Sequence, residues 1–373
     1  MSKSRPPWKI AGQTIARGQT LDVKLKVSER YTGDPISLPI RVIRAKKPGP
    51  TVFVTAAIHG EELNGVGVIH ELMYDDEMAG FVSGGAIQID AGTLMLVPVV
   101  NIFGFETQSR YMPDRRDLNR SFPGTANGSL TSRVARIVFE QVVERCDYGI
   151  DLHTAATNRT NYPNIRGDLS NPKVRRLAKA FGCELMVHGK GPEGSFRREA
   201  VKAGCGVIVV EAGEPLKVEP SVLEVGVRGV RNVLIELGML EGQPTRPPYQ
   251  LRIDKSTWVR ANVGGMLRFH VAPGQIVEEG QPIATNASVI GQERNVLTAP
   301  TAGIVLGMTT LPTVKPGEPV CHLAVPQRSL NPIIKKLSGT KSTSLHHRVR
   351  RDLATSISIT EREADPVGPT PDD

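Results

Sequence analysis

Short apolar segments alternate with amphipathic segments along the first 245 residues of the chain. The apolar segments are rich in β-branched residues, which is typical of strands that are buried on both faces. The segments between them place apolar residues three and four positions apart, which predicts helices. The predicted strands are 51–56, 94–100, 148–152, 184–187 and 206–210, and the predicted helices are 63–73, 132–145, 172–181 and 220–240. This alternation predicts an α/β sheet with helices on both faces.

The pattern changes after a proline-rich break at Gly242–Pro248, where short strands separated by Gly and Pro replace the helical period. Two half-units share the skeleton V-x-x-G-x-P-(I/V), one at Val277–Ile283 and one at Val314–Val320. The skeleton is similar to that of lipoyl and biotinyl carrier domains, but the joining stretch 284–298 contains no lysine that could carry a cofactor. We therefore predict a small all-β barrel or sandwich at 246–326 with a structural, interaction or substrate-gating role.

The last part of the chain, 327–373, is rich in Ser, Thr, Pro and charge, and its periodicity is weak. Such a composition predicts a disordered charged tail, with a short helix near Leu345 to Leu353. The predicted organisation is an α/β domain at 1–245, a β-rich domain at 246–326 and a tail at 327–373.

Composition places the chain among globular proteins, with 39% hydrophobic and 23% charged residues. Its apolar runs are too short to cross a bilayer, and the N-terminus leads into no apolar segment of the kind found in signal peptides. The cysteines form no C-x-x-C pair, which indicates reduced thiols in a cytoplasm and excludes a thiolate zinc finger. They are Cys146, Cys183, Cys205 and Cys321. We expect a cytoplasmic protein that does not bind membranes.

The net charge of +8 does not indicate nucleic-acid binding, because the charge is unevenly distributed. Between Arg328 and Arg351 there are seven Lys and Arg and no acid, whereas Asp352 to Asp373 contains six acids and one Arg. Aromatic residues that could stack on bases make up only 5% of the chain. We therefore expect no nucleic-acid partner.

Two of the polar segments that follow predicted strands contain metal-ligand residues. His59 and Glu62 are three residues apart at a strand-to-helix turn, and His153 follows a strand in which Asp151 could orient it. Alone, an H-x-x-E pair is most often an exposed turn, and a lone histidine is most often a core residue. Together, two imidazoles and a carboxylate form the three-ligand set that leaves one zinc position open for water.

Two further segments supply positive charge and a candidate base. Arg110, Arg115, Arg116 and Arg120 form a cluster that could be a solvated loop or could bind a carboxylate, since guanidinium groups bind carboxylates in a bidentate way. Glu211 ends a β-branched strand, where partial removal from water suits a general base, and Glu214 is a competing candidate.

In this order the motifs H-x-x-E, D-L-N-R, D-L-H and a late strand-end Glu resemble those of the succinylglutamate desuccinylase/aspartoacylase family. The resemblance covers about residues 45–240 closely, and the β-rich segment to about 325 in kind. It implies a zinc-carboxypeptidase-like mixed sheet flanked by helices, followed by a small all-β barrel or sandwich. It also implies one zinc per chain at His59, Glu62 and His153, a catalytic base at Glu211, a carbonyl-polarising Arg110, and substrate contacts from Asn119, Arg120 and Arg166.

The activity that this reading favours is hydrolysis of a small N-acyl amino acid, or of a related amide that carries a carboxylate. A metallocarboxypeptidase acting on short peptides is an alternative within the same fold. A non-catalytic zinc-binding regulatory protein is an alternative from another class, although such a protein has no need of Glu211. The expected partner is a small molecule, and a homo-oligomer is possible.

Overall fold

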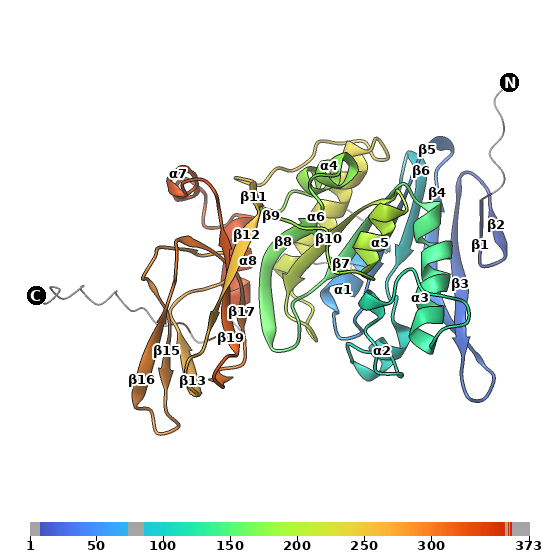
Figure 1. Ribbon diagram of the computed structural model, residues 1–373. Helices are drawn as coiled ribbons and strands as arrows, with labels where there is room; N and C mark the ends of the chain where they lie inside the picture. Colours follow the sequence, from blue (N-terminus) through green and yellow to red (C-terminus); the bar gives the residue numbers. More distant parts are fainter. Residues whose placement is uncertain (1–7, 74–85, 355–356, 358, 360–373) are drawn as a thin grey trace, which may run out of the picture. The chain divides into compact units, whose positions relative to one another are not determined.

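The structure is a computed structural model that describes residues 8–73, 86–354, 357 and 359 (Figure 1). It divides into two compact units. Unit 1 comprises Met1–Ala156 and Pro163–Arg252, and unit 2 comprises Thr157–Tyr162 and Ile253–Asp373. The domain boundaries predicted from the sequence stay predictions.

Unit 1 is built on a mixed sheet in the order β3-β4-β6-β5-β7-β10-β8-β9, to which β8 contributes its residues from Pro163 on. The central strands β6, β5, β7 and β10 are parallel, and β3 and β4 add to one edge in antiparallel pairing. The bounds are β3 (Gln19–Glu29), β4 (Pro35–Arg44), β5 (Lys47–Ala56), β6 (Ala91–Val97), β7 (Tyr148–His153), β8 (Arg159–Gly167), β9 (Leu185–His188) and β10 (Gly206–Gly213). A hairpin of β1 (Trp8–Ile10) and β2 (Gln13–Ile15) precedes the sheet.

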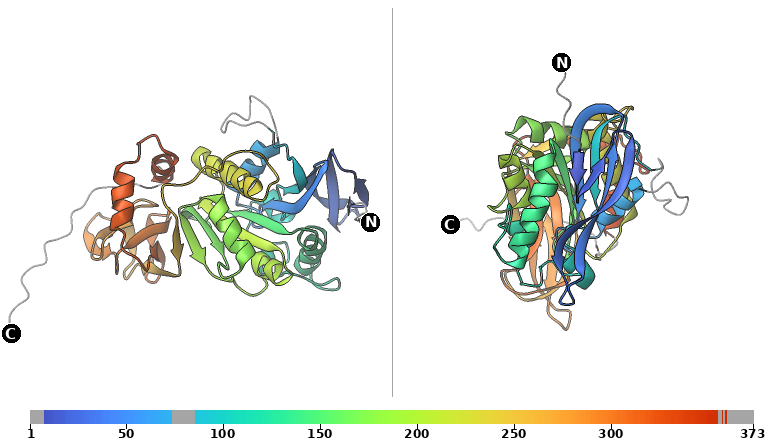
Figure 2. Two further views of the ribbon diagram at one scale, coloured as in Figure 1. Left: turned by 90° about the horizontal axis from the view of Figure 1, so that it is seen from above. Right: turned by 90° about the vertical axis from the view of Figure 1, so that its right-hand side faces the viewer.

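Helices cover both faces of this sheet, as Figure 2 shows. Alternate residues of β5 point to opposite faces, so Val52 and Val54 join one core and Phe53 joins the other. The first core is closed by α1 (Asn64–Met73), α4 (Pro172–Phe181) and α6 (Pro220–Glu236), and the second by α3 (Leu130–Gln141) and α5 (Phe196–Lys202). The predicted α/β sheet with two covered faces is therefore confirmed.

Several elements of unit 1 were not predicted from the sequence. They are β1 to β4, β8, α2 (Ile102–Thr107), α5 and the 3₁₀ turn Leu118–Arg120; a further 3₁₀ turn, Val143–Arg145, falls inside a predicted helix. Among the described residues, no helix is both long and apolar enough to cross a membrane.

Unit 2 contains only β-strands up to residue 325, in agreement with the predicted β-rich region. A four-stranded sheet runs in the order β16-β15-β13-β18, and β17 pairs with β19 and β14, with β12 beside β19. The bounds are β12 (Lys255–Arg260), β13 (Gly265–Phe269), β14 (Ile276–Val277), β15 (Pro282–Ala287), β16 (Glu293–Thr298), β17 (Gly303–Thr309), β18 (Thr313–Val314) and β19 (Pro319–Val325), while β11 (Leu251–Ile253) lies where the two units meet in sequence.

The sequence repeat is visible in the strands of unit 2. Val277 and Val314 each end a two-residue strand, and Pro282 and Pro319 each begin the strand that follows. The intervening Gly-containing turns have the same length, so each half-unit folds in the same local way.

The described part of the predicted tail contains two helices, α7 (Asn331–Ser338) and α8 (Leu345–Ala354). In α8, Val349 and Leu353 are buried, and the His346 ring Nδ1 lies 3.0 Å from the Tyr162 hydroxyl of the same unit. This amphipathic helix therefore packs into unit 2. The remaining tail residues, 355–356, 358 and 360–373, lie outside the described part of the chain.

Candidate active site

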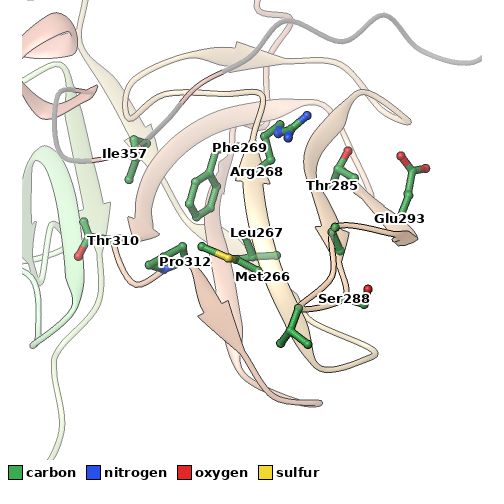
Figure 3. Close-up of a pocket in the computed structure, with 13 residues that line it drawn as sticks. Met266, Leu267, Arg268, Phe269, Thr285, Ser288, Glu293, Thr310, Pro312 and Ile357 are labelled. Atoms are coloured by element: carbon green, nitrogen blue, oxygen red, sulfur yellow. The ribbon is translucent and has the colours of Figure 1, made fainter.

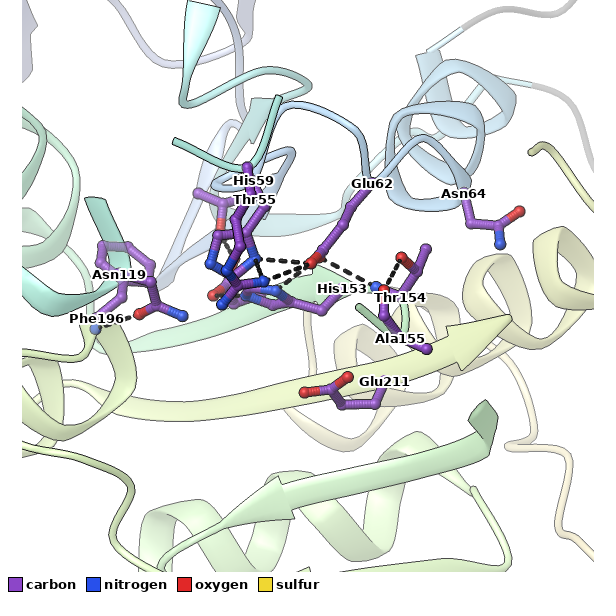
Figure 4. A network of polar contacts seen from close by, with 12 residues as sticks. Thr55, His59, Glu62, Asn64, Asn119, His153, Thr154, Ala155, Phe196 and Glu211 are labelled. Atoms are coloured by element: carbon purple, nitrogen blue, oxygen red, sulfur yellow. Dashed lines mark hydrogen bonds and ion pairs between the residues drawn. The ribbon is translucent and has the colours of Figure 1, made fainter. Parts of the chain in front are cut away.

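The carboxyl ends of three adjacent parallel strands, β5, β7 and β10, bring the predicted site residues together. His59 and Glu62 follow β5, and His153 ends β7. Glu211 in β10 is the direct register partner of His153. Because partnered residues on neighbouring strands point to the same face, the Glu211 carboxylate lies on the side of the sheet that His153 occupies (Figure 4).

His59, Glu62 and His153 form a buried cluster whose ligand atoms all lie within 4.8 Å of one another. Glu62 Oε1 lies 2.6 Å from His59 Nδ1, and Glu62 Oε2 lies 2.8 Å from His153 Nδ1. Each of the three residues is at most 5% exposed. Two imidazole nitrogens and a carboxylate are a donor set that suits zinc, so the residues present fit this metal.

A carboxylate lies close to the far nitrogen of each imidazole, and at His153 it forms a hydrogen bond. His153 Nε2 lies 2.7 Å from Asp151 Oδ2, and Asp151 Oδ1 accepts a hydrogen bond of 2.8 Å from the Thr55 hydroxyl. His59 Nε2 lies 3.3 Å from Asp117 Oδ1. Such carboxylate contacts hold a ligating histidine in one ring orientation and one tautomer. Asp151 was predicted in this role, but Asp117 was not.

Burial lowers the pKa of the His153 imidazole, but Asp151 and Glu62 outweigh burial and raise this pKa well above its usual value. For Glu62 the balance is the reverse, because burial raises its pKa while His59 and His153 hold it below its usual range. The cluster therefore attracts positive charge around the Glu62 carboxylate. Metal binding here would release protons, since imidazole ligands bind a metal in their neutral form.

The turn that presents His59 and Glu62 has little freedom. A Cβ atom on Gly60 would lie 1.9 Å from the carbonyl carbon of Gly104, so only glycine fits there. The Gly60 N–H also donates a hydrogen bond of 3.0 Å to the Ser109 carbonyl. This close approach holds the turn against the segment that leads to Arg110.

Arg110 reaches the edge of the metal-ligand cluster. Its guanidinium lies 3.2 Å from Asp117 Oδ2 and 3.2 Å from His59 Nδ1, and Nη1 lies 3.7 Å from Glu62 Oε1. Asp117 also accepts a hydrogen bond of 2.8 Å from the backbone N–H of Asn119. One carboxylate thus connects the His59 imidazole, Arg110 and the start of the Asn119–Arg120 segment.

The Asn119 side chain connects this segment to α5. Its Oδ1 accepts a hydrogen bond of 2.9 Å from the Phe196 N–H, which leaves the amide NH2 as the group that could bind an acceptor (Figure 4). The Arg120 guanidinium donates a hydrogen bond of 2.7 Å to the Asn119 carbonyl.

Arg197 is a site residue that the sequence analysis missed. The pKa of its guanidinium is lowered to about 10, mainly by burial and also by Arg166 and Arg120, while Glu211 and Asp151 oppose this shift. The segment Arg197-Arg198-Glu199 has the composition of a solvated helix face, and its helix was not predicted. No signal in the sequence separates Arg197 from its charged neighbours.

Glu211 lies beside Arg166, with 3.6 Å between Glu211 Oε1 and Arg166 Nη1, and its side chain is 16% exposed. Arg166 Nε also donates to Asn164 Oδ1 at 3.3 Å. The competing acid, Glu214, is instead paired with Lys217. Of the two candidates, Glu211 is the one whose register partner is His153 of the cluster.

A reciprocal pair of hydrogen bonds connects the loop after Glu211 to the first residue of α1. Asn64 Nδ2 donates to Glu219 Oε2 at 2.8 Å, and the Glu219 N–H donates to Asn64 Oδ1 at 2.8 Å. A Cβ atom on Gly213 would lie 2.0 Å from Glu219 Oε2, and Gly213 has a φ of +76°, so this position requires glycine. This Asn64–Glu219 pair holds the loop after Glu211 close to the Glu62 turn.

We expect Glu219→Ala to lower catalytic turnover by up to about 10²-fold, because small displacements of catalytic groups are costly. Glu219→Gln keeps an acceptor oxygen and should retain most of the activity. Burial raises the pKa of Glu219, so this group adds stability at low pH that is lost as the pH rises through its raised pKa. Glu219→Gln should lack that pH dependence in thermal melts. Equal turnover in the Ala and Gln variants would show that the pair does not position Glu211.

Several known proteins are similar to this chain in sequence or in fold. The chain is 29% identical over 275 residues to the N-alpha-acetyl-L-2,4-diaminobutyric acid deacetylase of Halomonas elongata. The aligned region covers 70% of this chain and 78% of the relative. The product-bound ectoine utilization protein EutE from Ruegeria pomeroyi is 25% identical, with a TM-score of 0.70 over 83% of this chain and 96% of that one.

A succinylglutamate desuccinylase/aspartoacylase structure from Rhodobacter sphaeroides has the same fold, with 23% identity and a TM-score of 0.68 over 83% of this chain and 95% of that one. The sequence profile of the succinylglutamate desuccinylase/aspartoacylase catalytic domain matches residues 48–237, just over half of the chain. That span begins in β5 and ends just after α6, and it includes every residue of the cluster described above. The chain therefore belongs to the succinylglutamate desuccinylase/aspartoacylase family.

Proposed function

We propose that this protein is a zinc-dependent amidohydrolase that cleaves the acyl group from a small N-acyl amino acid, or from a related amide that carries a carboxylate. The main support is geometric: His59, Glu62 and His153 form one buried donor set, and Glu211 is the register partner of His153. The name of the Halomonas elongata relative, a deacetylase of an N-acetylated amino acid, agrees with this reaction class.

Zinc bound at this cluster would lower the pKa of water toward about 7 and polarise the amide carbonyl. Glu211 would accept the proton of the attacking water and later deliver it to the leaving amine. Arg110, 3.7 Å from Glu62, would stabilise the negative charge that develops on the carbonyl oxygen. Asp117 would hold Arg110 in place through their 3.2 Å contact.

The positive charge around Glu211 supports a substrate with a carboxylate. Arg166 and Arg120 both lower the pKa of the half-buried Arg197, so the Arg197 guanidinium is repelled by these two groups. A carboxylate would relieve this repulsion and could bind guanidinium groups in a bidentate way. Arg120 and the Asn119 amide NH2 are the donors that we propose for it, and Arg166 and Arg197 would add positive charge.

A substrate panel tests the proposed activity. Purified protein loaded with zinc would be given N-acetyl and N-succinyl amino acids, short peptides with a free carboxyl end, and the same compounds amidated at that end. We expect hydrolysis of N-acyl amino acids that stops on chelation and returns with zinc. Turnover of peptides alone would favour the carboxypeptidase alternative, and zinc binding without any turnover would favour the non-catalytic alternative.

Arg120→Lys should reduce kcat/KM by about tenfold or more, mainly through KM. Lysine keeps the charge but loses the bidentate geometry, and a hydrogen bond to a charged group contributes about 1.5–3 kcal/mol. Steady-state kinetics on the free acid and on its amide would measure this. The exposed Arg116→Lys is the matched control and should behave as the unmodified protein. If the unmodified protein hydrolyses acid and amide at equal rates, Arg120 does not bind a substrate carboxylate.

A further inference from the structure

The strand β13 in unit 2 has one edge that its sheet covers only in part. On one side, β15 pairs with β13 along Met266 to Phe269. On the other side, β18 pairs only with Gly265 and Met266. Beyond that point, the Leu267 N–H donates a hydrogen bond of 2.6 Å to the Pro312 carbonyl. The edge of β13 therefore continues past the end of β18.

A residue from the C-terminal segment meets this edge. The backbone groups of alternate strand residues point to the same side, so Phe269 points its N–H and C=O the same way as Leu267, away from β15. At Phe269 the structure has a parallel bridge to Ile359. Ile359 thus takes the position along β13 that β18 leaves uncovered.

A cavity of about 530 Å³ lies beside the same edge (Figure 3). Met266, Leu267, Phe269 and Pro312 line it, and Ile357 lines it from the C-terminal segment. Ile357 also packs against the hydrophobic core of unit 2. The two described residues of this segment therefore make two different contacts: Ile357 with side chains of the cavity and Ile359 with the backbone of β13.

The sequence around these residues suits a strand on a half-buried edge. Ile357 and Ile359 alternate with Ser356, Ser358 and Thr360, which is the period-2 pattern of a strand with one apolar face. The exposed part of the cavity lining is mixed: Met266, at 52%, and Val289, at 95%, are apolar, and Arg268 and Glu293 are charged. An uncovered strand edge with apolar neighbours promotes association between chains, and a covering segment prevents it.

We propose that the groove along β13 is a docking site for the chain's own C-terminal segment, which adds to the sheet as a short strand anchored by Ile357 and Ile359. The segment begins close to its site, because α8 ends at Ala354, only three residues before Ile357, and the His346 ring of α8 lies 3.0 Å from the Tyr162 hydroxyl of unit 2. Three residues span at most about 10 Å, which favours docking within one chain over docking on a second copy. This mode of recognition is strand addition to an exposed sheet edge.

Two truncations provide a matched test on the full chain. Ending the chain after Ala354 removes both isoleucines and keeps α8, whereas ending it after Thr360 removes the acidic end and keeps both isoleucines. We expect at least about tenfold faster hydrogen exchange at the Phe269 N–H, with the Leu267 N–H as an internal control that stays bonded to Pro312, and stronger binding of an apolar fluorescent dye, only in the shorter protein. Ile357→Asp with Ile359→Asp in the full-length protein should reproduce both changes without shortening α8.

A synthetic peptide with the sequence of residues 355–361, added to the shorter protein, should restore protection at Phe269. The same peptide with serine in place of both isoleucines should not. Equal exchange in the two truncated proteins would overturn the proposal. Protection in the full-length protein that depends on protein concentration would also overturn it, because the occupant would then be the segment of a second copy. None of these measurements depends on hydrolytic activity, so the result is independent of the proposed function.

Discussion

Glu211→Gln should lower kcat by about 10² to 10⁴-fold while zinc content and substrate affinity stay near those of the unmodified protein. The amide keeps the shape of the side chain but cannot accept a proton. The residues that could hold the metal are His59, Glu62 and His153, and Glu211 lies beside Arg166, at 3.6 Å. Its loss should therefore affect proton transfer and not metal binding. Steady-state kinetics over a range of pH, together with metal analysis of the same samples, would measure both effects.

The control for this prediction is Glu214→Gln, because Glu214 is paired with Lys217 and should have little effect on turnover. The acidic limb of the pH–rate profile should disappear or move in the Glu211 variant, since protonation of the base produces that limb. A Glu211→Gln protein that loses zinc would identify Glu211 as a ligand. Near-normal turnover would place the base elsewhere.

His153→Ala should reduce bound zinc to well below one per chain and remove activity. The remaining donors, His59 and Glu62, cannot complete a three-ligand site, and the Glu62 carboxylate would lose its 2.8 Å contact with the imidazole. Metal analysis after dialysis, and titration with a zinc-sensitive chelator, would measure the loss. Full zinc content in this variant would rule out the site as described.

Two companion variants make the result specific. His70→Ala changes an exposed histidine of α1 and should keep zinc and activity. Asp151→Asn keeps the ligand but weakens the contact at His153 Nε2, so zinc affinity should fall by about 10 to 100-fold. Asp117→Asn should act in the same way through His59, and it should also weaken the hold on Arg110.

The architecture of unit 1 could be predicted from local pattern, because its strands are buried on both faces and read as apolar runs. The helix predicted at 172–181 has the same bounds in the structure, and the strand predicted at 148–152 extends by one residue to His153. The N-terminal strands were missed even though β3 alternates, with Val23, Leu25 and Val27 buried between exposed residues. Such an edge strand has only one buried face, and its signal is weaker than that of the central strands.

The sequence by itself determined which residues could form the metal-ligand set, because spacing and strand ends are local properties of the chain. His59 and Glu62 share a turn, His153 follows the strand segment Gly149–Leu152, and Glu211 follows the β-branched run Val207–Val210. Adjacency of β5, β7 and β10 then brings all four together, as expected when side chains follow the carboxyl ends of parallel strands.

Only the tertiary structure decided how the remaining charges are used. Asp117 contacts His59 across 58 positions of the chain, the Asn64–Glu219 pair spans 155, and Arg197 approaches Glu211 from a helix with no distinguishing sequence feature. The same holds for Ile359, which contacts Phe269 ninety positions earlier. A charged or apolar side chain has the same local pattern whether it faces water or a distant partner, so its role depends on which segments the folded chain brings together.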